Sequence, residues 1–180
     1  MALLTLGTGL YINFSANTSL AQIFGFEIIA GIGAGLVFEP PLIALQALVK
    51  QDDVASATAT LGFVRNLATS ISVVVGGVVL QNGMDEQQTG LRSAGLPESL
   101  VASFSGRSAV GNIDLIGKVS DAAWRGRIEA AFADSMRDIW ILNTAVCAVG
   151  FVATVFISKA VLSKEHTETK TGIREKEEVR

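Results

Sequence analysis

The stretch LAQIFGFEIIAGIGAGLVFEPPLIALQALV occupies residues 20–49 and carries only two charges, both of them glutamates. A helix on the surface of a water-soluble protein keeps a polar face, so its charges recur every few residues. Here that face is missing over more than the roughly 20 residues that cross the hydrocarbon core of a bilayer. Pro40 and Pro41 interrupt the run, because proline lacks the amide that a helix interior requires. We therefore predict a membrane segment over 20–48, with its span proper ending at residue 38 and a kink at the prolines.

The rest of the chain shows the same separation of charged and apolar segments. The 180 residues include 14 Lys and Arg and 17 Asp and Glu, and the mean hydropathy is +0.46. Arg65 is the only charged residue in 54–84, and residues 139–158 carry none. These runs predict further spans over 55–81 and 139–162, the first ending at an Asn-Gly turn signal. The expected fold class is all-α, with polytopic membrane helices in an integral, multi-pass membrane protein.

The remaining segments differ in character. Residues 1–14 are apolar but too short to span, and they indicate the last turns of a helix whose beginning is missing. The polar stretch 83–138 is predicted to be an extramembrane loop, within which Leu96-Pro97-Glu98 can open a short helix. The tail over 163–180 mixes both charges without aromatic residues and is predicted to be disordered.

An amphipathic helix is predicted over 120–138, at the end of that loop. Ser120 is its expected N-cap, and the helix is expected to lie at the membrane interface or on the bundle. Its apolar residues recur at helical spacing; they are Trp124, Ile128, Ala131, Phe132, Met136 and Ile139.

Several functional classes are disfavoured by composition. Cys147 is the single cysteine and lies in an apolar run, while His166 is the single histidine and lies in the charged tail. Neither a disulfide framework nor a cysteine metal site is available, and we expect no metal and no cofactor. No nucleophile–base pair appears in the spans, so the chain is not expected to be an enzyme. A sequence pI near 5.2 argues against a nucleic-acid partner.

Small residues in the spans predict close helix packing. Gly31 and Gly35 are four residues apart, which places them on one helix face, where small residues let membrane helices approach. The rival interpretation is a phosphate-binding loop, which needs a G-x-G-x-x-G run after a strand, and Leu36 occupies the place of the last glycine. Gly76 and Gly77 are interpreted in the same way, as packing residues.

Polar and ionisable side chains within spans are candidate functional residues, because burying them in lipid is costly. Glu27 lies in the middle of its span and is either a protonated packing residue or a carboxylate that titrates protons or recognises cations. Arg65 is expected to snorkel, pair with an acid or hold a gate. The uncharged residues that could line a polar path or bond between helices are Gln22, Gln46, Asn66, Ser70 and Ser72.

Four motifs together resemble the C-terminal part of fungal major facilitator superfamily transporters, in the fourteen-span drug:proton antiporter branch that includes toxin and multidrug efflux pumps. They are GIGAG (31–35), FEPPLIALQ (38–46), ATATLGFVRNLATSIS (57–72) and GGVVLQN (76–82). The resemblance implies the end of one span followed by three whole spans, a partial C-terminal bundle whose partner is the missing N-terminal bundle. Glu27 and Glu39 depart from the family pattern, where uncharged residues are usual.

The same resemblance implies a function for the longer parent protein: proton-coupled efflux of small organic molecules, such as drugs or toxins. The chain alone is then expected to be incomplete and inactive. Gln22, Glu27, Asn66 and Ser70 would face the cavity, with Arg65 as a gate or interhelical bond and a cytoplasmic-side bend at the prolines. The resemblance also implies a plasma-membrane location, with the 83–138 loop outside and the C-terminus in the cytoplasm.

A different class of function is also compatible with the sequence. A small, non-transporting membrane protein that oligomerises or regulates a relative would show the same spans and the same packing glycines. A membrane-bound enzyme is a third reading, disfavoured because its acid, base or metal ligands would have to converge from scattered residues. The sequence leaves the substrate and the coupling ion open.

Overall fold

The computed structural model describes residues 1–156, and all regular elements in that part are helices. The end of the predicted span 139–162 and the predicted disordered tail 163–180 fall outside the described residues. Two short 3₁₀ helices, η1 and η2, accompany nine α-helices in this part of the chain. In chain order the elements are α1 (Ala2–Leu10), η1 (Tyr11–Asn13), α2 (Leu20–Phe38), α3 (Pro40–Leu48), η2 (Gln51–Asp53), α4 (Val54–Glu86), α5 (Gln88–Ser93), α6 (Glu98–Ser103), α7 (Gly106–Gly111), α8 (Ile113–Ile116) and α9 (Ala122–Thr154).

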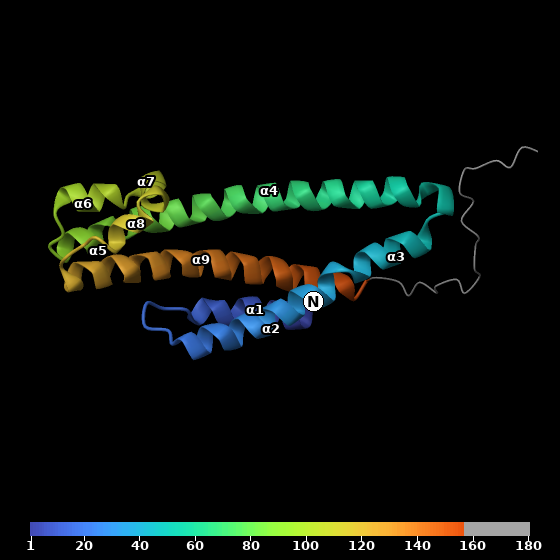
Figure 1. Cartoon of the computed structure of the whole chain (residues 1–180), viewed down its shortest axis with the longest axis horizontal. Coiled ribbons are helices and arrows are strands. Elements are labelled where there is room, and N and C mark those ends of the chain that lie inside the picture. The colour runs from blue at the N-terminus through green and yellow to red at the C-terminus, as the bar shows by residue number, and fades with distance from the viewer. Residues whose placement is uncertain (157–180) are drawn as a thin grey trace, which may run out of the picture.

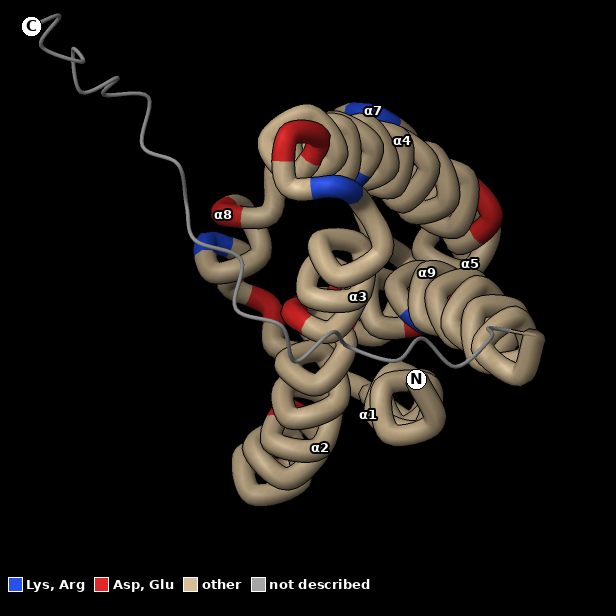
Figure 2. Tube along the Cα trace, turned by 90° about the vertical axis from the view of Figure 1, so that its right-hand side faces the viewer, with Lys and Arg blue, Asp and Glu red and all other residues tan. Residues whose placement is uncertain are grey.

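The long helices run side by side along the long axis of the molecule (Figure 1). Helices α4 and α9 are antiparallel, and α9 lies between α4 on one side and the α1–α2 pair on the other. The tube in Figure 2 is tan along most of these helices, since their charged residues are few. Three helical segments are long and apolar enough to cross a membrane, namely Leu20–Leu48, Gln51–Ser93 and Ala122–Thr154. The predicted all-α, multi-pass membrane fold is confirmed.

Helix α2 begins and ends where the sequence indicates. The hydroxyl of its N-cap, Ser19, accepts a hydrogen bond from the backbone amide of Gln22 (3.3 Å). The side-chain oxygen of Gln22 accepts one from the backbone amide of Ser19 (3.2 Å). Such a reciprocal capping box satisfies two backbone donors at the helix start. The helix ends at Phe38, and α3 follows with prolines in its first turn, where no amide is needed.

Close backbone contacts at two glycines join α1 to α2. A Cβ added to Gly7 would lie 2.5 Å from the Cα of Ala30, and one added to Gly33 would lie 2.7 Å from the Cα of Leu4. Real Cβ atoms do not approach other atoms so closely, so both positions require glycine at this helix separation. Helix α1 and the following η1 also contact α9, and the centroid of the Tyr11 ring in η1 lies 4.6 Å from that of the Trp140 ring in α9.

The prediction that the third segment ends at Asn82-Gly83 was wrong. Helix α4 continues through this dipeptide to Glu86. Gly83 is buried against α9, and a Cβ added to it would lie 2.9 Å from the Cβ of Ser135. The glycine therefore serves a close helix contact here, and the helix does not turn.

The predicted amphipathic helix and the last span form one continuous helix, α9, which starts at Ala122. Its N-cap is Asp121, not Ser120 as predicted. One carboxylate oxygen of Asp121 accepts hydrogen bonds from the amides of Ala123 (2.8 Å) and Trp124 (3.1 Å). A carboxylate satisfies these amides and also complements the positive end of the helix dipole, which a serine hydroxyl does not.

The buried face of that amphipathic segment is largely the predicted one. Ile128, Ala131 and Phe132 are buried, whereas Met136 is 44% exposed and Ser135 is buried in its place. Helices α4 and α9 each contain 33 residues. At 1.5 Å per residue each is about 50 Å long, about 20 Å more than the hydrocarbon core of a bilayer. Each helix is therefore longer than the hydrocarbon core, and the contact of Gly83 with Ser135 joins the end of α4 to α9.

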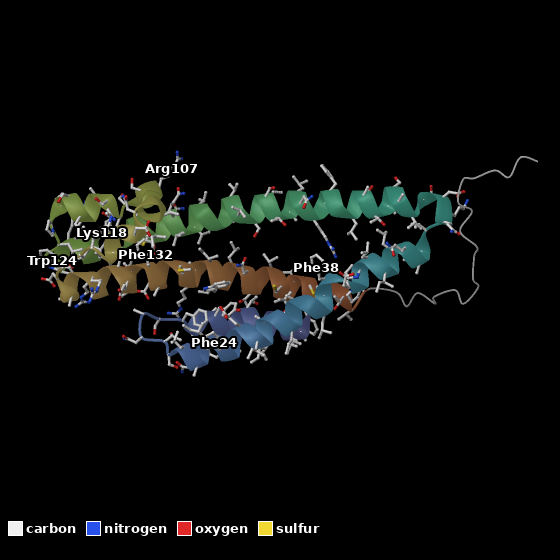
Figure 3. The ribbon with its side chains drawn as sticks, viewed as in Figure 1. Phe24, Phe38, Arg107, Lys118, Trp124 and Phe132 are labelled. Carbon is white, nitrogen blue, oxygen red and sulfur yellow. The ribbon has the colours of Figure 1, made fainter. Side chains whose placement is uncertain are left out.

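The predicted polar loop folds into a compact unit on the joined ends of α4 and α9. We call residues 83–132 the cap; helices α5–α8 form its outer part (Figures 1 and 3). At its centre, Phe104 is completely buried and meets the Phe132 ring edge-on, with 6.0 Å between the ring centroids. The buried apolar residues of this core are Met84, Leu91, Leu96, Val101, Phe104, Ala109, Val119, Ile128, Ala131 and Phe132.

Polar side chains satisfy the backbone where the short cap helices end. The buried Gln88 amide donates to the carbonyls of Phe104 (3.0 Å) and Met84 (3.3 Å). On the exposed surface, Arg92 donates to both carboxylate oxygens of Glu98 and lies 2.9 Å from one of them. This hydrogen bond lowers the pKa of Glu98 and raises that of Arg92. The bonds connect α4, α5 and α6, so the cap has a defined tertiary structure.

The contact of Gly83 with Ser135 predicts a compensating pair of substitutions. Gly83→Ala is expected to destabilise the protein by about 1–3 kcal/mol, because the added methyl group overpacks the α4–α9 contact. Ser135→Gly in the same chain removes the opposing Cβ and is expected to recover a large part of that loss. Thermal unfolding followed by circular dichroism in detergent measures both. Gly77→Ala is the matched control, since no described atom lies within 4 Å of a Cβ there. Additive effects of the two changes would contradict the contact.

Candidate functional site

A groove between α4 and α9 lies in the membrane-spanning part of the structure. Its volume is about 370 Å³, which falls within the range of small-molecule sites. Gly76 faces α9 at one wall of the groove. A Cβ added to Gly76 would lie 4.0 Å from the Ile139 side chain. The lining residues are Ala68, Ile71, Ser72, Val75, Gly76, Ile139, Leu142, Asn143 and Val146.

Two polar side chains, one from each helix, interrupt this apolar lining. Ser72 comes from α4 and Asn143 from α9. Neither side chain donates to or accepts from another residue within 1–156. An amide and a hydroxyl in an apolar groove can orient a ligand that carries both polar and apolar groups. Asn143 was not a candidate in the sequence analysis, although it is the only amide side chain in the uncharged run 139–158.

The structure does not bring together the four residues predicted to face a cavity. Gln22 is used in the capping box of α2, and Glu27 is exposed farther along the same helix. Asn66 and Ser70 are exposed on α4, where the Ser70 hydroxyl donates to the Asn66 carbonyl (2.9 Å). Figures 1 and 2 place α2 and α4 apart for most of their length, with α9 beside both the α1–α2 pair and α4. Their role in a transport pathway stays a prediction.

Two side chains that the sequence analysis singled out, Gln46 and Arg65, join α4 to the segment that precedes it. The Gln46 amide of α3 donates to the Thr58 hydroxyl of α4 (3.3 Å). Arg65 of α4 donates to the carbonyl of Phe38, the last residue of α2, and its guanidinium lies 4.3 Å from the centroid of the Phe38 ring. Arg65 thus makes an interhelical bond at the break before Pro40, one of the roles predicted for it.

The predicted packing glycines divide into two groups. Gly76 faces Ile139, whereas Gly31, Gly35 and Gly77 have no described atom within 4 Å of a Cβ position. Three glycines that the sequence analysis did not select for packing make close contacts between helices; these are Gly7, Gly33 and Gly83. That Gly31, Gly35 and Gly77 pack against another helix therefore stays a prediction, because no described residue covers the helix faces on which they lie.

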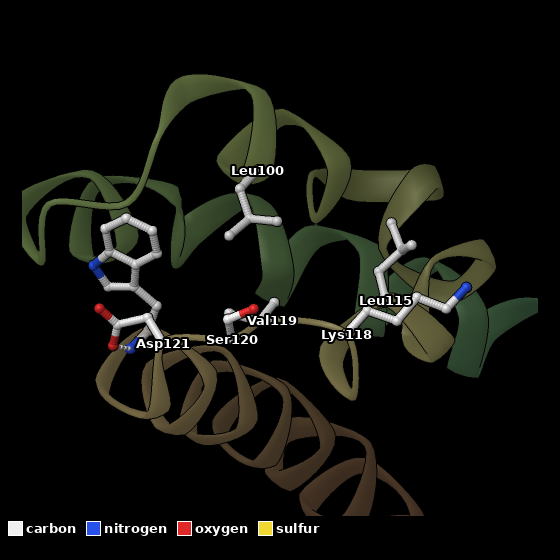
Figure 4. Close-up of a pocket in the computed structure, with 7 residues that line it drawn as sticks. Leu100, Leu115, Lys118, Val119, Ser120 and Asp121 are labelled. Carbon is white, nitrogen blue, oxygen red and sulfur yellow. Dashed lines mark hydrogen bonds between the residues drawn. The ribbon is translucent and has the colours of Figure 1, made fainter.

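A second cavity of about 390 Å³ lies in the cap, between α6, α8 and the start of α9 (Figure 4). Its apolar lining includes Leu100, Leu115 and Trp124. The Asp121 carboxylate at its edge is already bonded to the first amides of α9. Among the described residues, no three His, Cys, Asp or Glu side chains gather to hold a metal ion. The α4–α9 groove, with its two uncommitted polar groups, is the better candidate site.

The chain is similar to fungal membrane transporters over nearly its whole length. It is 39% identical over 169 residues to the MFS-type transporter ppz2 of Metarhizium majus, covering 94% of this chain and 29% of that protein. It is 38% identical over 173 residues to the efflux pump dotC of Dothistroma septosporum, covering 96% and 29%. It is 37% identical to an MFS-type transporter of Aspergillus terreus, covering 96% and 31%. The chain thus spans less than a third of the length of these curated relatives. No family model and no solved structure matches it.

Proposed function

The chain belongs to the major facilitator superfamily (MFS) of membrane transporters, and we propose that it forms part of a proton-coupled exporter of small organic molecules. The observation that carries this proposal is its similarity to proteins named efflux pump and MFS-type transporter over 94–96% of its length. The three helices long and apolar enough to cross a membrane support it. The rest of the transporter, including an N-terminal bundle, is the proposed partner of this chain, together with the lipid bilayer and an unidentified small-molecule substrate.

The α4–α9 groove is the proposed contact of this part with substrate. In alternating access, helices rock around a site near the middle of the membrane. Ser72 and Asn143 would bond the polar group of an amphipathic substrate, and the surrounding aliphatic side chains would hold its apolar part. We further propose a plasma-membrane location, with the cap on the extracellular side and the C-terminus in the cytoplasm.

Asn143→Leu tests this assignment in the transporter encoded by the whole gene. Loss of one hydrogen bond to substrate costs about 1.4 kcal/mol, which predicts roughly tenfold slower transport at low substrate concentration. The measurement is uptake of rhodamine 6G, an amphipathic cation, by inside-out vesicles with an imposed proton gradient.

Asn82→Leu is the matched control, because Asn82 is an exposed amide on α4 outside the groove. Unchanged uptake in Asn143→Leu would show that the groove does not bind this substrate. Absence of gradient-driven export by the unmodified transporter, across a panel of amphipathic cations and neutral compounds, would overturn the proposed function itself.

The four residues predicted from the sequence define a separate test in the same transporter. Gln22, Glu27, Asn66 and Ser70 are proposed to face a cavity completed by the rest of the protein. Alanine at each position is expected to lower efflux, and alanine at Glu27 is also expected to change its pH dependence if that carboxylate carries protons. Efflux rates between pH 5 and 8 provide the readout. Four variants with unchanged rates and pH profiles would refute this assignment.

A further inference from the structure

The break between α2 and α3 leaves backbone carbonyls without their helical partners. Pro40 and Pro41 have no amide to give to the carbonyls four residues before them. The amide of Leu42 would bond the Phe38 carbonyl in a continuous helix, but it bonds the Glu39 carbonyl instead (3.0 Å). The Phe38 carbonyl is therefore exposed at the C-terminal end of α2, inside an apolar segment that is long enough to span a membrane.

A single side chain from another helix compensates for this loss. Arg65 of α4 donates from Nη2 to the Phe38 carbonyl, and its guanidinium also lies over the Phe38 ring, 4.3 Å from the centroid. Figure 3 labels Phe38 near the end of α2, where the chain passes into α3. A cation at this end of a helix complements the negative end of its dipole, and a planar guanidinium can bond and stack at once.

Within the described residues, no carboxylate forms an ion pair with Arg65. Within residues 1–156, Arg92 and Glu98 are the residues that approach as an ion pair. Glu39 is the neighbour of Phe38 in sequence, yet no bond from Arg65 to its side chain is formed in this part of the chain. In the described part of the chain, the hydrogen bond to the Phe38 carbonyl and the contact with the Phe38 ring hold this guanidinium.

We propose that Arg65 is a positioning residue that replaces the helix amide lost at the prolines and so fixes the angle between α2 and α3. An unsatisfied carbonyl in a bilayer is costly, so the bond to Arg65 favours the one orientation in which it forms. The Gln46–Thr58 bond holds α3 to α4 at a second point. With both contacts in place, α4 fixes the direction of α2 relative to α3.

This inference has a specific consequence: Arg65 is needed only because the prolines are present. Replacing both prolines by alanine restores two amides and lets Leu42 bond Phe38 within a continuous helix. Arg65 should then lose its effect on the helix angle. An ordinary structural role for Arg65, such as anchoring α4, would not depend on the prolines in this way.

Distances between spin labels at Phe24 and Leu48 test the proposal in the full chain in lipid nanodiscs, with Cys147→Ser as background. Both positions are exposed, one on α2 and the other on α3. Arg65→Ala is expected to widen the distance distribution about twofold, because the break loses its fixed angle. Arg65→Lys keeps the charge but not the planar stacking, and should give an intermediate width. Phe38→Leu keeps the carbonyl and removes the ring, and should widen it less than Arg65→Ala.

The double proline variant provides the decisive comparison. Pro40→Ala with Pro41→Ala is expected to give a narrow distribution near 36 Å, about the length of 24 helical residues. Adding Arg65→Ala to it should then change nothing. Equal widths for the unmodified chain and both Arg65 variants, or the same widening by Arg65→Ala with and without the prolines, would overturn the proposal. Because the readout is a distance, it is independent of whether transport is detected.

Discussion

Phe104→Ala is expected to destabilise the cap by about 3–5 kcal/mol, the usual cost of removing a fully buried phenylalanine ring. The ring is 0% exposed and contacts Phe132 edge-on, so its loss leaves a cavity between the short helices and α9. The backbone carbonyl of the same residue accepts the bond from Gln88 (3.0 Å), and a relaxed loop would weaken this bond as well.

Amide hydrogen exchange in detergent or nanodiscs measures this effect region by region. Amides of residues 84–132 are expected to lose protection, whereas the middle of α4 and α9 should keep theirs, because helical bonds in an apolar environment have no competing partner. Phe24→Ala is the matched control, since that ring is 60% exposed on α2. An unchanged exchange rate in the cap of Phe104→Ala would contradict the core described above.

Gly33→Leu is the second substitution with a large expected effect. A Cβ at this position would lie 2.6 Å from the backbone nitrogen of Leu4, and backbone atoms cannot rotate out of the way. The larger side chain must therefore separate α1 from α2, at a cost of about 1–3 kcal/mol or more. Tyr11 should then leave its contact with Trp140.

The fluorescence of Trp140 reports this separation when Trp124 is replaced by phenylalanine. Gly33→Leu is expected to shift the Trp140 emission as Tyr11 moves away from the ring. Gly31→Leu is a close control, two residues earlier on the same helix with no described atom within 4 Å, and should leave the spectrum unchanged. If Gly31→Leu perturbs Trp140 as much as Gly33→Leu does, the close approach of α1 to α2 is not at Gly33.

The first and last residues of a membrane helix could be predicted from the sequence only where neighbouring residues determine them. The start of α2 at Leu20 and its end before Pro40 follow from the loss of charge and the loss of an amide, both readable in one segment. The role of Gly83 was not readable, because a glycine can end a helix or permit a close contact. Its partner, Ser135, is 52 residues away in the chain, and only the folded structure brings it near.

Helix α9 shows a related difficulty. Its sequence changes from amphipathic to wholly apolar near Ile139, and we predicted two helices from that change. The spacing of apolar residues indicates what surrounds a helix: protein and water around the first part of α9, and lipid around the second. It does not indicate whether the helix is interrupted between the two parts. Without a proline or glycine at the change, the helix continues.

The candidate groove was not predicted, although two of its residues were singled out for other reasons, Ser72 as a polar residue and Gly76 as a packing residue. Both come from α4 and line the groove. Asn143 was not predicted, because a single amide in an uncharged span gives no sign of what it faces until the neighbouring helix is placed. Which side chains face one another across the groove depends on the rotation of α4 relative to α9, which no single segment encodes.

The cap also has a consequence for how the protein is made. Residues 83–132 form a buried apolar core at the joined ends of α4 and α9. Passing these residues through a bilayer would require that core to unfold. Folding of the cap is therefore expected to oppose passage of this segment through the bilayer, and so to preserve the orientation that α4 and α9 have once inserted.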